Sequence, residues 1–117
     1  MLDFADTRYE YFAPKPNRLV IALGRLLNRH ILLPGARHRV CDVTVQGLES
    51  LTQIRPTAGQ RLLFLPNHST HSDAETMVEA QRRCGVASQF MAAYDVFQRG
   101  RFTAWVMQHS GAFSVDR

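Results

Sequence analysis

A histidine and an aspartate lie five residues apart in the stretch PNHSTHSD, residues 66–73. A carboxylate such as that of Asp73 can accept a hydrogen bond from one imidazole nitrogen, which fixes the tautomer of the ring and stabilises the imidazolium. The other nitrogen of His68 is then free to take a proton. The simplest interpretation is a general base that activates a hydroxyl on a substrate, although the serine and threonine hydroxyls of the same stretch could in principle supply a nucleophile.

Two other interpretations of this stretch stay open. A loop histidine is often only a capping or surface residue. His68, His71 and Asp73 also form an H-x-x-H-x-D cluster, which would give a metal at most three ligands from one short loop. Because no further His or Cys lies nearby in the sequence, we expect no metal site.

The elements on either side of this stretch would position it. The run Leu62–Leu65 is continuously apolar between Arg61 and Pro66, which predicts a strand buried on both faces. Ser72 and Glu75 form an S-x-x-E capping box, so a helix is predicted from Asp73 to about Cys84, with Gly85 as its stop. His68 would therefore lie in the turn between strand and helix.

The remaining pattern predicts an α/β fold with a mostly parallel sheet and crossover helices. Alternation over residues 40–45 predicts a half-buried strand, and residues 52–60 read as a polar connection. Further elements are expected as a strand at 86–92, a helix at 97–110 and a strand at 113–115. The carboxyl ends of parallel strands meet at one edge of a sheet, so His68 and Arg117 would face one crevice. An arginine there could hold a phosphate through two hydrogen bonds.

Residues 1–39 form a separate N-terminal region. Residues 1–16 read as an irregular arm without chemistry, and Asn17 is a candidate helix N-cap. The helix that follows is amphipathic, with an apolar stripe opposite the basic residues Arg18, Arg25 and Arg29, and it stops at Pro34-Gly35. Such a helix fits an anionic membrane surface, and the alternative is a helix packed on the domain with a solvated arginine face.

Two blocks of this sequence resemble the glycerolipid acyltransferases, the family of 1-acylglycerol-3-phosphate and glycerol-3-phosphate O-acyltransferases. Asn67-His68 with Asp73 matches the family's N-H-x-x-x-x-D block. Residues 111–117, GAFSVDR, are similar to its G-x-F-x-V-x-R block, and residues 90–97 occupy the place of the strand and aromatic segment between them. The family's basic residue after that strand is represented here by Ala93 and Tyr94, a departure that bears on acceptor binding.

The resemblance implies a function in phospholipid biosynthesis. His68 would deprotonate an acceptor hydroxyl, Asp73 would orient His68, and the substrate-binding residues would be Asn67, Gly111, Phe113 and Arg117. The acceptor would be a phosphorylated glycerol or a lysophospholipid, and the donor an acyl thioester of coenzyme A or acyl carrier protein, with no other cofactor. Backbone N–H groups at the start of the helix after Ser72 are one candidate for stabilising the oxyanion.

The resemblance covers about residues 40–117, the first half of the family's domain, and the later E-G-T and proline-containing blocks are not found in this sequence. We therefore expect the chain to be a fragment that is inactive by itself. The alternative function is a non-catalytic domain that binds lipid or a membrane surface.

Composition limits the compartment and the partners. Fourteen basic and ten acidic residues give a formal net charge of +4, which suits anionic partners. Lys15 is the single lysine and no compact basic run is interleaved with aromatics, so nucleic acid is the poorer choice. Two cysteines are too few for a disulfide framework. The sequence contains no run of about 18 apolar residues, so no membrane span is predicted. We expect a cytoplasmic protein that is peripheral on the inner face of a membrane.

Overall fold

The computed structural model describes residues 8–53 and 61–116. The chain divides into two compact units, of which the first combines residues 1–24 with residues 88–117 and the second is residues 25–87. The described part is a mixture of helices with one small parallel sheet, which is compatible with the expected α/β class.

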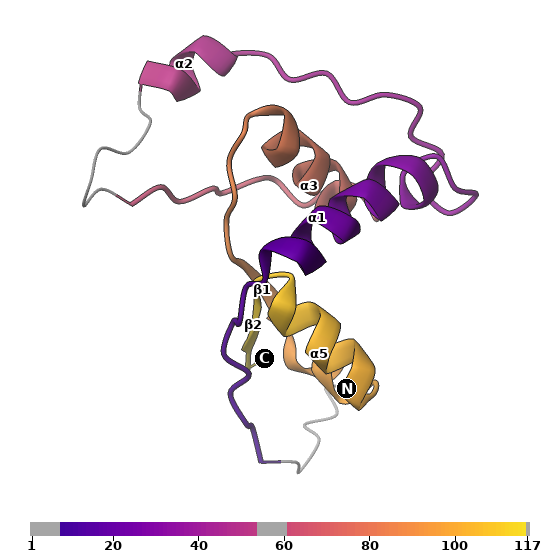
Figure 1. The fold of residues 1–117 in the computed structure, drawn as a ribbon, viewed down its shortest axis with the longest axis vertical. Coiled ribbons are helices and arrows are strands. Elements are labelled where there is room, and N and C mark those ends of the chain that lie inside the picture. The colour runs from indigo at the N-terminus through magenta and orange to yellow at the C-terminus, as the bar shows by residue number, and fades with distance from the viewer. Residues whose placement is uncertain (1–7, 54–60, 117) are drawn as a thin grey trace. The chain divides into compact units, whose positions relative to one another are not determined.

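The first unit contains the sheet. Strand β1 (Phe90–Ala93) pairs in parallel with β2 (Ala112–Val115), and the register sets Phe90 opposite Ala112. The connection between the strands is helical, and in Figure 1 α5 lies beside the strands. The parallel pair joined by a helical crossover confirms the predicted order of the last three elements.

The crossover is two helices rather than the single helix predicted at 97–110. Helix α4 (Tyr94–Gln98) begins directly after β1, and α5 (Arg101–His109) follows Gly100. Glycine in a helix costs up to about 1 kcal/mol relative to alanine, so this position favours a break. The break allows both helices to contribute to one core, in which Phe97 and Ala104 pack with Ala112 of β2.

The described part of the N-terminal arm, residues 8–16, is irregular, as predicted, and it is fixed to this unit by contacts with β2. The backbone N–H of Ser114 donates to the carbonyl of Phe12 at 3.1 Å, and the N–H of Phe12 donates to Ser114 Oγ at 2.8 Å. The ring of Phe12 stacks on Phe97 with centroids 5.0 Å apart. The arm therefore covers the free edge of β2 and contributes an aromatic ring to the core.

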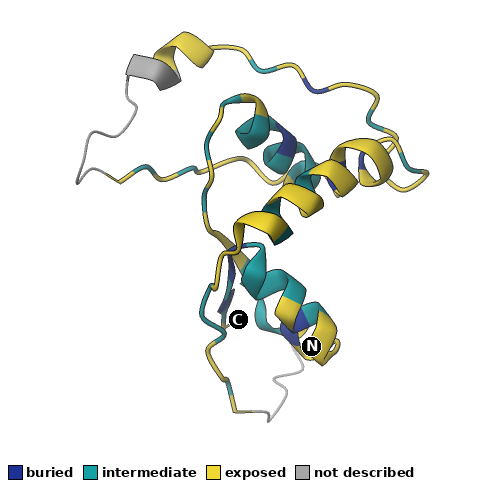
Figure 2. Cartoon of the chain, in the orientation of Figure 1, coloured by how far each residue is buried: buried dark blue, intermediate teal, exposed yellow. Residues whose placement is uncertain are grey.

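Helix α1 (Arg18–Leu27) begins where the sequence predicts, and Asn17 Oδ1 accepts hydrogen bonds from the first amides of the helix. It continues as a π-helical segment, η1 (Asn28–Leu32), which ends ahead of Pro34. Figure 2 shows that α1 is largely exposed. Its exposed apolar residues, with those of η1, include Leu19, Leu23, Leu26, Leu27 and Ile31. Whether this side meets a membrane stays a prediction, and no helix in the described ranges is long and apolar enough to cross one.

Helix α3 (Asp73–Arg83) confirms the helix predicted at 73–84, and its end shows why Gly85 is the stop. The N–H of Gly85 donates to the carbonyl of Arg82 and the N–H of Val86 donates to that of Gln81. These two bonds form a Schellman motif, which requires a left-handed residue after the cap. Gly85 supplies it with a φ of 66°.

Two predicted strands of the second unit do not form. Residues 61–69 are irregular, and Leu63 and Leu65 are 77% and 83% exposed, although the sequence predicts a buried strand there. Residues 40–45 are also irregular, although Val43 is buried. A strand needs a neighbour for its hydrogen bonds, and in the described ranges the one sheet holds only β1 and β2. A short helix, α2 (Leu48–Gln53), follows residues 40–45, and its last two residues lie in the connection predicted at 52–60.

Candidate active site

The turn before α3 is held together by the carboxylate of Asp73. Its Oδ2 accepts the backbone N–H of Thr70 at 2.7 Å and also that of Ser69, and its Oδ1 accepts the Thr70 hydroxyl at 2.6 Å. A short side chain that accepts nearby backbone N–H groups closes an Asx-type turn. The sequence pattern places Asp73 in the first turn of the predicted helix. The tertiary structure shows that its carboxylate also holds the preceding loop.

His68 lies in this turn beside the same carboxylate. Its Nδ1 is 3.3 Å from Asp73 Oδ2, and its side chain is 85% exposed whereas that of Asp73 is 23% exposed. The carboxylate is thus fixed by the loop while the imidazole is open to solvent. One ring nitrogen faces a carboxylate, which is the arrangement that leaves the other nitrogen available for a proton.

The hydrogen bonds to Asp73 lower the pKa of its carboxyl below the ordinary value of 3.8. The side-chain hydrogen bond from Thr70 is the largest cause, followed by the backbone hydrogen bond from the same residue. The backbone N–H of Ser69 and the charge of His68 act in the same direction, and desolvation opposes them. Asp73 is therefore ionised at neutral pH, as a partner for an imidazolium must be.

The predicted capping box is wrong in its side-chain contacts. Ser72 is the N-cap of α3, but its side chain does not cap the helix in the described structure. Instead, Ser72 Oγ lies 3.0 Å from Nδ1 of His38, and Nε2 of His38 lies 3.6 Å from Glu75 Oε1. The two residues of the sequence signature thus face a histidine that precedes them by more than 30 positions.

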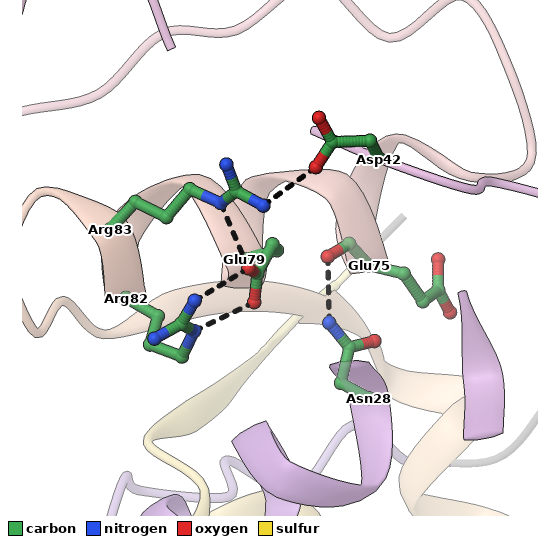
Figure 3. Close-up of polar contacts among 6 residues, drawn as sticks. All are labelled: Asn28, Asp42, Glu75, Glu79, Arg82 and Arg83. Carbon is green, nitrogen blue, oxygen red and sulfur yellow. Dashed lines mark hydrogen bonds and ion pairs between the residues drawn. The ribbon is translucent and has the colours of Figure 1, made fainter. Parts of the chain in front are cut away.

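The middle of α3 carries a buried carboxylate. Glu79 is 2% exposed and accepts two hydrogen bonds from Arg82, at 2.8 and 2.9 Å, and one from Arg83 at 3.0 Å. Arg83 also donates to Asp42 at 2.8 Å, and Figure 3 shows both arginines converging on Glu79. The hydrogen bond from Arg82, then that from Arg83, lowers the pKa of Glu79 to about 2. This cluster ties residues 40–43 to the helix that carries Asp73.

A second contact holds the beginning of α3. Asn28, buried in η1, donates from its side-chain amide to the backbone carbonyl of Glu75 at 2.9 Å (Figure 3). A hollow of about 280 Å³ lies between η1, residues 40–43 and α3, and neither His68 nor Asp73 is among its lining residues. The hollow is therefore not the place where the His68 and Asp73 pair would act.

The metal interpretation gains no support from the geometry. Among residues 8–53 and 61–116, no group of three or more His, Cys, Asp and Glu side chains is arranged to hold a metal ion. His71, the third member of the H-x-x-H-x-D cluster, is exposed.

The other predicted site residues are placed as follows. Asn67 is exposed in the irregular segment before His68. Gly111 and Phe113 belong to the first unit, where Gly111 is buried ahead of β2 and Phe113 is half-buried opposite Met91. Arg117 lies outside the described residues, so the crevice expected between it and His68 stays a prediction.

A model of the Acyltransferase family matches residues 42–117, which is more than half of the chain and contains both His68 and the block that begins at Gly111. The chain belongs to the acyltransferase family. This membership agrees with the resemblance to glycerolipid acyltransferases drawn from the two sequence blocks. No curated protein and no solved structure matched the chain.

Sequence reasoning missed several residues that shape this candidate site. The sequence pattern suggested Thr70 only as a nucleophile, yet its hydroxyl and its backbone amide both bind Asp73. Its position three residues before that aspartate was the sequence signal that could have predicted these contacts. His38 and Asn28 gave no local signal, because both act on α3 from 34 or more positions away.

Proposed function

We propose that this acyltransferase moves a fatty acyl group from a thioester of coenzyme A or acyl carrier protein to a hydroxyl of a glycerol phosphate or lysophospholipid, as in phospholipid biosynthesis. The observation that carries the proposal is the contact of His68 Nδ1 with Asp73 Oδ2 at 3.3 Å, within a chain of this family. The exposure of His68 supports it further, because a base must reach a substrate that arrives from solution.

In the proposed reaction, Nε2 of His68 takes the proton of the acceptor hydroxyl as its oxygen attacks the thioester carbonyl. The tetrahedral intermediate collapses, the carbon–sulfur bond breaks, and the proton passes from His68 to the departing thiolate. Asp73 stabilises the imidazolium between these steps. No acyl-enzyme is required, because a positioned base and bound reactants account for much of the rate.

The proposed acceptor differs from the acceptors of other acyl transfers in carrying a phosphate. From the resemblance, we assign its binding to Arg117, with Asn67, Gly111 and Phe113 lining the substrate. A guanidinium matches a phosphate through two parallel hydrogen bonds, so Arg117→Lys should raise the KM for a phosphorylated acceptor more than Arg117→Lys raises the KM for the donor.

Acyl transfer by the protein in its full natural length tests the proposal. Acyl-coenzyme A and acyl carrier protein donors are offered with glycerol 3-phosphate and a panel of lysophospholipids, and both the thiol and the ester product are measured. We expect His68→Ala to lower the rate by roughly 10²- to 10⁴-fold and Asp73→Asn to lower it substantially, with folding retained. His71→Ala is the matched control and should leave the rate unchanged.

Two outcomes would overturn the proposal. Full activity in His68→Ala would remove the base from the mechanism. Thiol release without ester formation for every acceptor would make the protein a thioesterase instead.

The exposed apolar residues of α1 favour binding to a lipid surface as an accompanying function. An apolar side chain brought to a bilayer interface gains free energy, and Arg18 and Arg29 would add attraction to anionic lipids. We propose that α1 contacts an anionic membrane, on its cytoplasmic face. Co-sedimentation with vesicles containing anionic phospholipid should be weakened by Leu23→Glu, whereas Leu63→Glu, on an exposed leucine outside α1, should have no effect. Equal binding of both variants and the parent would contradict membrane contact through α1.

A further inference from the structure

His38 is a histidine with a nearly inaccessible side chain that the proposed mechanism does not use. Its side chain is only 6% exposed, although the residue lies on an irregular loop after η1. The loop is pinned locally, because the N–H groups of His38 and Arg39 both donate to the carbonyl of Gly35, at 3.1 and 2.8 Å. The backbone then bends through Arg39, whose φ is 53°. A non-glycine residue with positive φ is uncommon, so this bend is held by its surroundings.

The imidazole of His38 meets α3 at both sides of Asp73. Nδ1 lies 3.0 Å from Oγ of Ser72, the residue directly before Asp73, and Nε2 lies 3.6 Å from Oε1 of Glu75 in the first turn. Ser72 Oγ can donate to Nδ1 or accept from it, because the direction follows the tautomer of the ring, and the 3.6 Å between Nε2 and Oε1 is a close polar contact rather than a hydrogen bond. One ring therefore contacts both side chains that the sequence pattern assigns to a capping box.

These contacts take the place of the side-chain contacts that a local capping box would make. In a capping box, Ser72 and Glu75 would satisfy backbone amides of their own helix, and the helix could begin without help from elsewhere. Here the first turn is held instead by His38 and by the amide of Asn28, which donates to the Glu75 carbonyl. The orientation of that turn is then set by η1 and its following loop.

The first turn of α3 in turn determines where Asp73 points. Asp73 lies between the two residues that His38 contacts, and its carboxylate holds the amides of Ser69 and Thr70 and meets His68. Small errors in the placement of a general base reduce catalysis strongly, since an error of about 1 Å can cost on the order of a hundredfold. We infer that His38 is a positioning residue: it fixes Ser72 and Glu75 on either side of Asp73, and thereby holds the Asp73 carboxylate against His68. This inference rests on the proposed role of His68 as the base.

The test compares His38→Ala with His38→Gln, whose amide N–H can still reach Glu75. The control is His30→Ala, at an exposed position of η1. Two quantities are measured in the protein at full natural length: kcat and KM for acyl transfer, and the NMR amide shifts of Ser69 and Thr70 with the ring ¹⁵N shifts of His68. We expect His38→Ala to lower kcat roughly ten- to a hundredfold with KM little changed, and to move both amide signals upfield as their hydrogen bonds to Asp73 weaken. His38→Gln should restore part of both effects, and His30→Ala should change neither.

Unchanged Ser69, Thr70 and His68 signals in a folded His38→Ala protein would overturn the inference. If that variant unfolds, Ser72→Ala decides, because it removes one His38 contact and should shift the same signals by a smaller amount; no shift would again overturn the inference. The NMR readout does not depend on turnover. Activity retained in His68→Ala would therefore refute the proposed base, while the amide shifts would still report whether His38 fixes Asp73.

Discussion

The hydroxyl of Thr70 donates to Oδ1 of Asp73 across 2.6 Å, while the backbone N–H of the same threonine donates to Oδ2 at 2.7 Å. One residue thus occupies both oxygens of the carboxylate that lies beside His68. The Thr70 hydroxyl is also the largest cause of the lowered pKa of Asp73. Thr70 is therefore the residue through which the charge and the orientation of Asp73 can be altered without touching either member of the pair.

Thr70→Val should raise the pKa of Asp73 towards its ordinary value of 3.8, because the nearly isosteric side chain removes the hydroxyl donor. A carboxyl group whose pKa is lowered in the folded state stabilises that state above its ordinary pKa of 3.8. This stabilisation is lost as the pH falls through the lowered pKa, so in the variant the loss should occur at higher pH. We also expect acyl transfer to fall roughly three- to tenfold. A ¹³C titration of the Asp73 carboxyl measures the pKa. Ser69→Ala, which keeps the backbone amide that binds Asp73, is the control and should not shift it.

Glu79→Gln should destabilise the protein by roughly 2 kcal/mol at neutral pH, because hydrogen bonds between charged groups are lost at a side chain that is 2% exposed. The pKa of Glu79 is lowered from 4.5 to about 2, so its contribution is complete above about 4.5 and disappears as the pH falls towards 2. Urea unfolding between pH 2 and pH 7 should show this loss in the parent and a flatter profile in the variant.

The matched control for Glu79 is Asp95→Asn. Asp95 and Arg99 form a pair at 3.8 Å in which both side chains are more than 60% exposed. Such surface pairs contribute about 0 to 1 kcal/mol. Equal destabilisation by both substitutions would contradict the structural role given to the Glu79 cluster.

Ser114→Ala should loosen the N-terminal arm, because it leaves the N–H of Phe12 without its 2.8 Å acceptor. We expect a loss of about 1 to 2 kcal/mol and faster hydrogen exchange at the Phe12 amide. Tyr9→Phe removes only the phenol hydroxyl, which lies 3.0 Å from the backbone carbonyl and from Oγ of Ser114, and should have the smaller effect. Exchange at Phe12 that is no faster in Ser114→Ala would show that the remaining contacts, the Ser114 N–H bond to the Phe12 carbonyl and the stacking on Phe97 among them, hold the arm without Ser114 Oγ.

Gly111→Ala should destabilise the protein by about 1 to 2 kcal/mol through its backbone. The φ of Gly111 is 93°, and an added Cβ would meet its nearest neighbour, the Ser88 carbonyl oxygen, at an ordinary 3.7 Å, so conformation rather than space opposes the substitution. Gly24→Ala is the contrasting variant, because this exposed helical glycine has open space around it and should gain about 0.5 to 1 kcal/mol. Thermal unfolding should show opposite shifts of the unfolding temperature in the two variants. If Gly111→Ala leaves stability unchanged, substrate binding would be the remaining reason for a glycine at this position.

The sequence by itself determined the elements whose signals are local. Asn17 and Gly85 act on amides and carbonyls within a few residues, so the start of α1 and the end of α3 could be predicted from residue types alone. The contact of His68 with Asp73 was equally accessible, because five residues of one turn separate them. The parallel pairing of β1 with β2 followed from two apolar runs joined by a helical segment.

Only the tertiary structure decided the features that depend on distant partners. Leu62–Leu65 has the composition of a buried strand, but pairing and cover come from other parts of a chain. In the described ranges this run pairs with no strand, and Leu63 and Leu65 are exposed. Ser72 and Glu75 have the pattern of a local cap, yet the Ser72 side chain does not cap the helix and its Oγ lies 3.0 Å from Nδ1 of His38 instead. The physical reason is the same in both cases: a hydrogen-bonding group goes to whichever partner the fold brings within about 3 Å, and sequence spacing reveals that partner only when it lies within a turn or two.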